Sequence, residues 1–343
     1  MNVSPLVRLV GKWGGYGLAR SLTARQPRML MYHRFTSSDS DPRVKGVSAD
    51  TFERQVAFIA RQYQPMTVTE MVKGCFEGAP LPKHAIALTV DDGYEDFYNI
   101  AWPILKRYKV PATFYVTTGF VDGKLWLWPD QLMWILENAP LPAASLVPFT
   151  DGTESVLPTP DHKVRERLFS RLVSHLLRIP DADKHSFLKA LAEHWQISIP
   201  DKAPRWARAV SWSQLAEMQE EGLEVGGHTV THPSLSQVSH NQAREEIMGA
   251  KDDLVANLGE CPRSFCYPNG TQEDFVAEQV PIIRQANFTG AVVAFADEQG
   301  QSQRYAMRRH SSSDSMFQFY KAVSGVEYLG HRLRKTQRDT VYE

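Results

Sequence analysis

The sequence predicts an α/β fold built on a parallel sheet. Its 343 residues can bury a full hydrophobic core in one large domain. Two apolar runs, at 86–90 and 111–116, enclose an amphipathic segment at 96–108. A strand, a helix and a strand in this order form the βαβ unit of a parallel sheet.

The other predicted elements continue this alternation. Residues 28–32 read as the first core strand, and Ser48 or Asp50 can cap a helix that runs to about residue 63. A second capped helix begins near Ser211. Further helices are predicted at 69–76, 165–177, 183–195, 241–258 and 272–286, and further strands at 223–225, 264–267 and 290–295.

Composition argues against several classes of protein. Lys and Arg total 38 and Asp and Glu total 39, so the net charge is −1 and no nucleic-acid footprint is present. The cysteines Cys75, Cys261 and Cys266 lack paired spacing, which favours a reducing compartment over a disulfide scaffold. The sequence has neither a signal-peptide core nor an apolar run of membrane-spanning length. We therefore expect a cytoplasmic protein.

Both ends of the chain are predicted to lie outside the main domain, as an N-terminal arm at 1–27 and a C-terminal tail at 317–343. Up to residue 25 the charged residues of the arm are all basic and lie among apolar side chains. Such a segment could lie on an anionic membrane surface, although its glycines weaken the helix required. An arm that packs against the domain is the alternative.

Residues 124–205 interrupt the alternation and are predicted to form a helical insertion or lid. They begin with Trp126 and Trp128, continue through a Pro- and Thr-rich loop at 140–162 and contain the amphipathic segments given above. The two tryptophans could stack on sugar rings of a substrate. They could equally form the hydrophobic core of the insertion, which is the more frequent role of such residues.

Two adjacent carboxylates follow the apolar run at 86–90. Asp91 and Asp92 precede Gly93, and where a strand ends and the chain turns both side chains can reach one cleft. Carboxylates this close repel each other, so a cation or another partner is needed to keep both ionised. Taken alone, the motif also fits a solvated turn.

A histidine pair far downstream makes a metal site the stronger interpretation. His228 and His232 are four residues apart, so in a helical turn both imidazoles would share one face. Two histidines and one aspartate form a metal-binding set that leaves coordination positions open. Two surface histidines beside the start of a helix are the alternative.

The motifs resemble those of the metal-dependent polysaccharide deacetylases, carbohydrate esterase family 4. The Asp-Asp-Gly motif of that family is matched at 89–93, its His-Thr/Ser-x-x-His-Pro motif at 228–233 and its Pro-x-Gly loop at 265–270. The resemblance implies a distorted (β/α)7-type barrel. Residues 28–123 and 206–316 would form this barrel, with the helical insertion between them.

The resemblance also implies roles for individual residues. Asp91 would be the general base, and Asp92, His228 and His232 would bind one divalent metal ion. Zinc is expected first, with cobalt, nickel or iron as alternatives. The metal would polarise an amide carbonyl and lower the pKa of a bound water, and the backbone N–H of Asn269 would stabilise the oxyanion.

A substrate-binding set completes the predicted site. His33 ends the first strand, where a barrel would direct it into the same mouth as Asp91. The Tyr-His pair at this point is similar to the start of exopolysaccharide deacetylases, which implies a site role for His33; a satisfied buried histidine is the alternative. The other predicted substrate-binding residues are Tyr94, Tyr267, Pro268, Trp126 and Trp128.

The sequence departs from the family pattern at two points. Cys266 stands where the family often has an arginine that orients the base, and Arg308 or Arg309 could supply this charge from another strand, with Arg309 favoured. The late Leu-x-His of the family, which protonates the leaving amine, is missing. His310 is the candidate for this role, with a surface or structural histidine as the alternative.

These observations predict a hydrolase that removes N-acetyl groups from an amino sugar in a polysaccharide or glycolipid precursor. The expected partner is an N-acetylated saccharide, with no nucleic acid and with peripheral membrane contact as one option. Hydrolysis of another C–N bond or of an O-acetyl ester is the alternative within enzymes. A non-catalytic carbohydrate-binding barrel is the alternative outside them. The sequence does not indicate the oligomeric state, the metal or the sugar.

Overall fold

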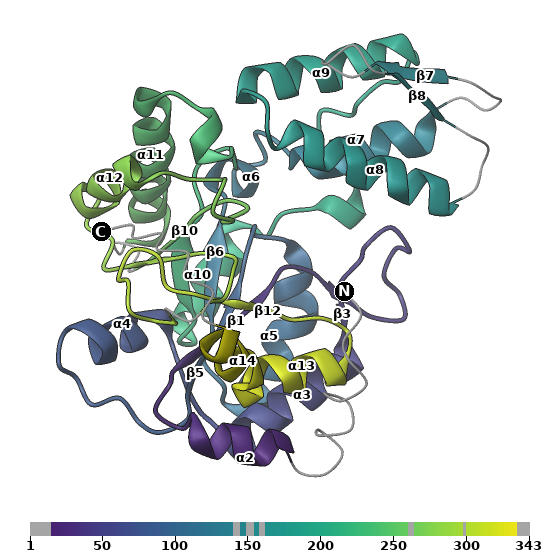
Figure 1. Cartoon of the computed structure of the whole chain (residues 1–343). Coiled ribbons are helices and arrows are strands. Elements are labelled where there is room, and N and C mark those ends of the chain that lie inside the picture. Colours follow the sequence, from purple (N-terminus) through teal and green to yellow (C-terminus); the bar gives the residue numbers. More distant parts are fainter. Residues whose placement is uncertain are drawn as a thin grey trace.

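A parallel sheet curled into a barrel forms the centre of the protein (Figure 1). The computed structural model describes residues 15–139, 145–148, 154–157, 162–259, 264–297 and 300–334. The strands of the sheet are β1 (Arg28–Tyr32), β4 (Gln64–Met66), β5 (Ala85–Val90), β6 (Thr113–Val116), β9 (Glu224–Gly227), β10 (Phe265–Cys266), β11 (Ala291–Val292) and β12 (His310–Ser311). Their order is β11-β10-β9-β6-β5-β1-β12, with β4 paired to β5.

The two ends of this sheet meet and close the barrel. Met307 forms a parallel bridge with Val292 of β11, and three residues later His310 of β12 pairs with Leu30 of β1. Every pairing around the circuit is parallel, and its strands follow one another in chain order. The predicted α/β fold with a distorted (β/α)7-type barrel is therefore confirmed.

The barrel strands are buried on both faces. All residues of β1 and β5 are buried, because helices cover the outside of the barrel and side chains fill its inside. Close packing requires a glycine at position 226. A Cβ atom on Gly226 would lie 2.5 Å from the ring of Tyr115, so a larger residue would push β9 away from β6.

The surrounding helices mostly begin where the sequence predicts. Ser48 caps α3 (Ala49–Gln62), and Ser211 forms a capping box at the start of α10 (Trp212–Glu220). Capping boxes also start α4 (Val68–Phe76) and α11 (His240–Leu258). Three short helices lie between these elements: α6 (Thr118–Val121), η2 (Arg205–Ala207) and η3 (Leu235–Gln237).

Two predicted helices are interrupted near prolines. The segment at 96–108 is π-helical over Phe97–Ala101 (η1) and becomes α5 (Trp102–Tyr108), which has Pro103 in its first turn. The segment at 272–286 contains only η4 (Ala277–Gln279) and α12 (Val280–Gln285), which also has a proline in its first turn. Proline has no backbone N–H to donate to the preceding turn, so each α-helix begins beside it.

The insertion forms its own helical layer, seen at the upper right of Figure 1. Its helices α7 (Trp128–Asn138), α8 (His162–Leu176) and α9 (Asp181–His194) share a separate hydrophobic core. The predicted loop at 140–162 contains an antiparallel hairpin of β7 (Ser145–Pro148) and β8 (Glu154–Leu157), so the prediction of a loop throughout was wrong. Pairing the two segments satisfies their backbone hydrogen bonds.

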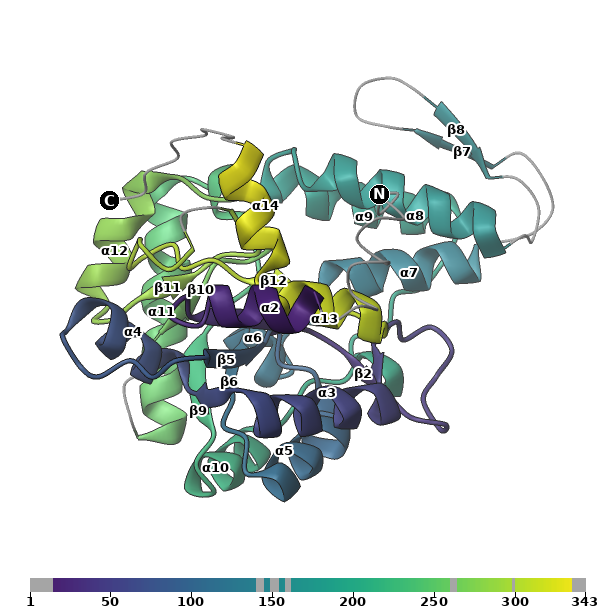
Figure 2. The same cartoon turned by 60° about the horizontal axis from the view of Figure 1, so that its bottom comes forward.

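The described parts of both ends pack on the barrel. Helix α2 (Gly15–Leu22) lies beside α13 (Met316–Ser324) and α14 (Val326–Arg334), as Figure 2 shows. Phe319 of α13 is fully buried in the main core, so the predicted tail begins as part of the domain. Residues 1–14, which hold much of the predicted membrane-contact segment, lie outside the described residues. Among the described helices, none has the length and hydrophobicity to cross a membrane.

Candidate metal centre and catalytic site

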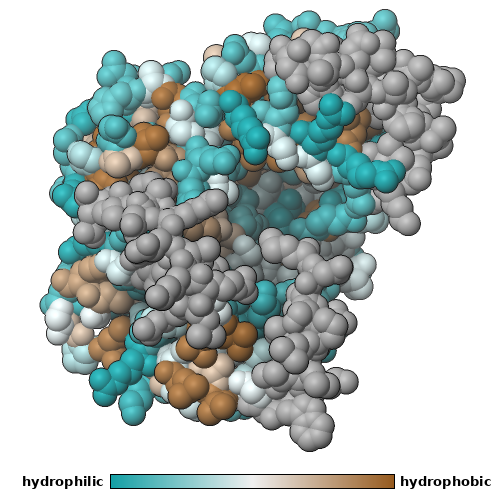
Figure 3. Space-filling model, viewed as in Figure 1, coloured by the Kyte–Doolittle hydropathy of each residue, from teal (hydrophilic) through white to brown (hydrophobic). Residues whose placement is uncertain are grey.

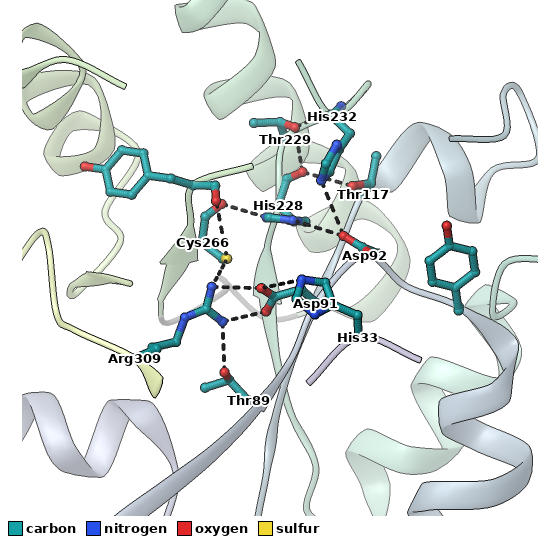
Figure 4. A network of polar contacts seen from close by, with 12 residues as sticks. His33, Thr89, Asp91, Asp92, Thr117, His228, Thr229, His232, Cys266 and Arg309 are labelled. Carbon is teal, nitrogen blue, oxygen red and sulfur yellow. Dashed lines mark hydrogen bonds and ion pairs between the residues drawn. The ribbon is translucent and has the colours of Figure 1, made fainter. Parts of the chain in front are cut away.

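The carboxyl ends of the barrel strands bring the predicted site residues together. The strands are parallel, so the residues that follow them emerge at the same end of the barrel. The register pairs Tyr32 of β1 with Val90 of β5, and the next residues are His33 and Asp91. Figure 4 shows both side chains in one polar network with His228, which follows β9.

Asp92, His228 and His232 form a compact cluster of metal-binding groups. The Nε2 atoms of His228 and His232 lie 3.4 and 3.3 Å from Oδ1 of Asp92, and all three ligand atoms lie within 4.8 Å of one another. Both imidazoles are buried. The Nδ1 atom of His228 lies 2.8 Å from the carbonyl oxygen of Cys266, a contact that orients the ring toward Asp92.

The two histidines reach this cluster from a loop. The predicted helical turn is wrong, because β9 ends at Gly227 and residues 228–234 have no helical structure. Thr229 and His232 adopt left-handed φ angles of 63° and 62°, which fold the loop back on itself. The backbone N–H of His232 donates to the hydroxyl of Thr229 at 3.1 Å. The two imidazoles are therefore brought together by a folded loop and not by a turn of helix.

A half-buried carboxylate on α11 holds this loop. Glu246 accepts hydrogen bonds from the backbone N–H groups of Val230 and Thr231, both at 2.8 Å. It also accepts the hydroxyl of Thr231 at 2.6 Å. Left-handed residues other than glycine persist only where the surroundings fix them. Glu246 provides three such contacts, all to residues that lie between His228 and His232 in the sequence.

Asp91 pairs with Arg309, and one of its carboxylate oxygens also lies within 4.8 Å of a ring nitrogen of His228 and of Sγ of Cys266. The guanidinium donates to both carboxylate oxygens, at 2.6 and 2.8 Å, and neither side chain is more than 3% exposed. Arg309 also donates to the hydroxyl of Thr89 at 2.8 Å and lies 3.1 Å from Sγ of Cys266. Arg309, which directly precedes β12, thus reaches the space beside Cys266, where the family pattern has its arginine.

His33 is the imidazole nearest to this pair on the open side. Its Nε2 lies 3.9 Å from Oδ2 of Asp91, and 46% of its side chain is exposed. The alternative of a satisfied buried histidine is therefore wrong. Its exposure leaves His33 accessible to a molecule that approaches Asp91.

The pKa values of the two aspartates follow from these partners. Burial raises the pKa of Asp91, but the charge and hydrogen bonds of Arg309 outweigh burial and lower the pKa overall. Burial also raises the pKa of Asp92, and hydrogen bonds from both imidazoles hold it well below its usual range. Both carboxylates are therefore ionised at neutral pH. Without these partners, the repulsion between two adjacent carboxylates would raise the pKa of one of them.

The two imidazoles differ in their affinity for a proton. Burial lowers the pKa of His232. Burial has the same effect on His228, but the Cys266 sulfur and the Asp92 carboxylate outweigh it and hold the pKa of His228 well above its usual value. A cation that binds here displaces this proton, so its affinity falls as the pH is lowered.

The predicted oxyanion turn is formed at Pro268-Asn269-Gly270. Asn269 has a left-handed φ of 59°, and no group in the described part of the chain accepts its backbone N–H. Its side-chain Nδ2 is also buried without a partner. The turn therefore presents N–H donors that a ligand can use.

Tyr267, which precedes this turn, is not placed to bind a substrate. Its side chain is buried, stacks on Phe275 and donates from its hydroxyl to the carbonyl of Tyr305 at 3.0 Å. The tyrosine thus packs in the core on the outer side of β10.

His310 is also placed elsewhere, which corrects the prediction of a general acid. Successive residues of a strand face opposite sides, so Arg309 points into the barrel and His310 points out. There Nδ1 of His310 lies 2.8 Å from Glu327 of α14. The alternative, a structural histidine, matches this position.

The two predicted sugar-stacking tryptophans are core residues. Trp126 and Trp128 are 4% and 3% exposed. Trp126 packs edge-on to Trp134 and Trp206, and Trp128 lies in the core of the insertion. Tyr94 is also buried, and its hydroxyl donates to Asp130 at 2.7 Å. None of the three has a free face for a sugar ring.

Comparison with known proteins identifies the family. The family model for polysaccharide deacetylases matches residues 78–140 and 181–290, about half of the chain. The chain belongs to the polysaccharide deacetylase family. The two matched ranges contain Asp91, Asp92, His228, His232 and the Asn269 turn. They also include the first and last parts of the insertion, residues 124–140 and 181–205, and leave residues 141–180 unmatched.

Curated relatives of this polysaccharide deacetylase match over short stretches. A poly-β-1,6-N-acetyl-D-glucosamine N-deacetylase of Escherichia coli O157:H7 is 31% identical over 110 residues, which are 30% of this chain and 16% of that protein. A protein of the same name from Staphylococcus aureus is 35% identical over 92 residues, covering 25% of this chain and 30% of that protein. The chain therefore matches less than a third of the length of either relative.

Solved structures share the fold of this polysaccharide deacetylase over most of its length. A Streptococcus pyogenes deacetylase in complex with acetate has a TM-score of 0.56 at 19% identity, covering 89% of this chain and 97% of that one. IcaB from Ammonifex degensii has the same TM-score at 17% identity, covering 88% of this chain and 97% of that one.

The residues of this polysaccharide deacetylase fit a divalent metal ion. Two buried imidazoles and one ionised carboxylate converge on one point, and this donor set suits transition metals. The carbonyl oxygen of Cys266 holds Nδ1 of His228, whereas Nδ1 of His232 is buried without a partner among the described residues. Asp92, His228 and His232 are thus the candidate ligands.

Proposed function

We propose that this chain hydrolyses the N-acetyl amide of an amino sugar in a polysaccharide or glycolipid precursor. One observation carries the proposal. An ionised, arginine-paired Asp91 stands next in sequence to a cluster of Asp92, His228 and His232 at the open end of a barrel. An ionised carboxylate beside a cation site is the arrangement that water-mediated hydrolysis requires.

Asp92, His228 and His232 would hold the cation, with zinc expected first and cobalt, nickel or iron as alternatives. A bound divalent cation polarises the amide carbonyl and makes water more acidic. Asp91 takes the proton of the attacking water. Arg309 keeps this carboxylate ionised and fixes its orientation, because both guanidinium bonds hold it in one plane.

Two further groups of the chain act on the amide. The free backbone N–H of Asn269 donates to the carbonyl oxygen as negative charge develops there. His33 supplies the proton to the departing nitrogen. It replaces His310 in this proposal, because it is exposed and lies beside Asp91, whereas His310 is paired with Glu327.

The substrate class is supported by the relatives, whose names specify poly-β-1,6-N-acetyl-D-glucosamine. We therefore propose a glycan of N-acetylhexosamine units, and a cytoplasmic precursor of a surface polysaccharide is the expected form. Figure 3 shows a recess lined by hydrophilic residues between the insertion and the barrel. A separate cavity of about 1190 Å³ is lined by Arg34 and Asp96 of the barrel and by Trp134 of the insertion, and none of Asp91, Asp92, His228 and His232 lines it.

The test is acetate release from defined substrates. Metal-free protein is loaded with zinc and incubated with β-1,6-linked N-acetylglucosamine oligomers, and mass spectrometry follows the loss of single acetyl groups. We expect loss from these oligomers, none after chelation and at least about 100-fold slower loss with Asp91→Asn. Release from O-acetylated oligomers alone would favour the esterase alternative. Saccharide binding without release would favour the non-catalytic barrel.

A further inference from the structure

Tyr94 joins the insertion to the metal-binding loop. It follows Gly93 directly, and its backbone forms an antiparallel bridge with Ala209, in the segment that returns from the insertion. On one side the N–H of Glu95 donates to the carbonyl of Arg208 at 3.0 Å. On the other, the N–H of Val210 donates to the carbonyl of Gly93 at 2.9 Å. The chain that leaves Asp92 is thus paired with the chain that leaves the insertion.

The side chain of Tyr94 is held by the other end of the insertion. Asp130, in the first turn of α7, is 7% exposed and accepts the Tyr94 hydroxyl at 2.7 Å. The guanidinium carbon of Arg34 lies 3.7 Å from the centre of the Tyr94 ring, and Phe120 packs edge-on against the ring. Burial raises the pKa of Asp130 to about 6, so the carboxylate is the form present above that pH.

The loop between Asp92 and Tyr94 needs such support. Asp92 has a φ of 80° and Gly93 a φ of 102°, both outside the ordinary range of L-residues. A conformation of this kind is retained only where neighbouring contacts impose it. Tyr94 is the first residue after this turn with a side chain that other elements hold. A change in its position moves the carboxylate of Asp92 relative to the two imidazoles.

We propose that Asp130 is a positioning residue for the metal site, which acts through the Tyr94 hydroxyl to fix the Asp92-Gly93 turn. The insertion then supports the metal site, since Asp130 near its start and Ala209 just after its end both contact Tyr94. This inference rests on the proposed metal-dependent function. It concerns the affinity for the cation, however, and can be tested without a substrate.

A matched control lies on the same helix. Glu137, two turns after Asp130, lies 3.5 Å from Arg43 in the loop between β2 (Phe35–Thr36) and β3 (Val47–Ser48). This ion pair ties α7 to the barrel two helical turns away from Asp130. Glu137→Gln therefore weakens the docking of the insertion and leaves the Tyr94 hydroxyl bonded.

The experiment is calorimetric titration of Co²⁺ into the metal-free full chain and its variants. Asp130→Ala and Tyr94→Phe should each weaken binding by about 10-fold, the lower end of the effect of changing a residue that orients a metal ligand. The double variant should be no weaker than either single variant, because both remove the same hydrogen bond. Asp130→Asn should bind like the wild type, since its amide oxygen still accepts the hydroxyl.

Three results would overturn the inference. Asp130→Ala within twofold of wild type would show that the contact does not reach the cation site. An equal loss in Glu137→Gln would show that only docking of the insertion matters. A loss in Asp130→Asn equal to that in Asp130→Ala would point to the charge of Asp130 instead of its bond to Tyr94. Should Asp130→Ala fail to fold, Tyr94→Phe, which removes a single hydroxyl, decides alone. Absence of acetate release in the wild type would reject the proposed function and leave these affinities interpretable.

Discussion

Asp91 and Asp92 are neighbours in sequence but belong to two different regions of the site. Asp91 faces Arg309, a cation that the protein itself provides and holds with two hydrogen bonds. Asp92 faces two imidazoles that together leave a place for a cation from solution. In Figure 4 the carboxylate of Asp91 lies beside the guanidinium, and that of Asp92 lies beside the imidazoles of His228 and His232.

The comparison shows how one residue type acquires two roles. A carboxylate already neutralised by a buried guanidinium has little to offer a metal ion, but it can accept a proton. A carboxylate among imidazoles can complete a coordination shell. Breaking a buried ion pair by removing one partner costs about 3–5 kcal/mol, so the assignment of Asp91 to Arg309 is fixed by the fold. The assignment of Asp92 depends on the shape of a loop with left-handed residues.

The largest expected effect comes from removing the negative charge of Asp91, the aspartate that pairs with Arg309. Asp91→Asn should lower turnover by about 10²–10⁴-fold, the range attributed to general base catalysis, because the amide cannot take a proton from water. The rate of acetate release at saturating metal measures this effect. Turnover within threefold of wild type would remove Asp91 from the role of base.

The next effect separates the two candidate proton donors. His33→Ala should lower turnover by about 100-fold, because His33 is the exposed imidazole beside Asp91. His310→Ala should stay within about threefold of wild type, because this residue faces α14. Steady-state kinetics of both variants on one oligosaccharide compares them directly. The reverse order of effects would restore the prediction drawn from the family pattern.

A smaller effect is expected at the support of the histidine loop. Glu246→Ala should weaken metal binding by about 10–100-fold, since two backbone N–H groups and one hydroxyl lose their acceptor. Glu246→Gln should retain most of the affinity, because its amide oxygen can accept both N–H groups. Titration of Zn²⁺ into each metal-free variant checks this order. Equal affinity of Glu246→Ala and wild type would show that the loop is held by other contacts.

The smallest effect on turnover is expected at Glu327, which pairs with His310 on the outer side of β12 and contributes to stability instead. Burial opposes ionisation, but His310 and Lys321 lower the pKa of Glu327 to about 2. The folded pKa is below the unfolded one, so this stabilisation is complete above about pH 4.5 and is lost as the pH falls through about 2.

Glu327→Gln should therefore reduce the free energy of unfolding by up to about 3 kcal/mol at pH 7 and by progressively less below pH 4.5. Denaturant titrations of both proteins across this range measure the difference, and turnover should be unchanged. A difference that stays constant with pH would show that the charge of Glu327 is not the cause.

The sequence predicted the fold and the residues that converge, because these depend on local signals. Apolar runs alternate with amphipathic segments, and parallel pairing places everything after a strand at one end of the barrel. Asp91, Asp92, His228 and His232 lie where predicted. Arg309 also lies against Asp91, and the functional roles of these residues stay predictions.

The errors arise where side-chain direction or long-range packing decides. His310 is one residue from Arg309, and a step of one residue in a strand turns a side chain to the opposite face. For Trp126 and Trp128 the sequence permits either sugar stacking or a core role, and the core role is the more frequent one for such residues. The structure buries both side chains.

Glu246 and Asp130 were missed entirely. Each is a single acidic residue on an amphipathic helix, and nothing in its local sequence distinguishes it from a solvated charge. Only the fold brings Glu246 to the loop at 230–231 and Asp130 to Tyr94.

The division between the two aspartates is tested most directly by titrating Zn²⁺ into metal-free Asp91→Asn and Asp92→Asn side by side. We predict that Asp91→Asn binds one ion with nearly wild-type affinity and that Asp92→Asn binds at least about 100-fold more weakly. Equal loss of affinity in the two variants, or loss confined to Asp91→Asn, would contradict the account.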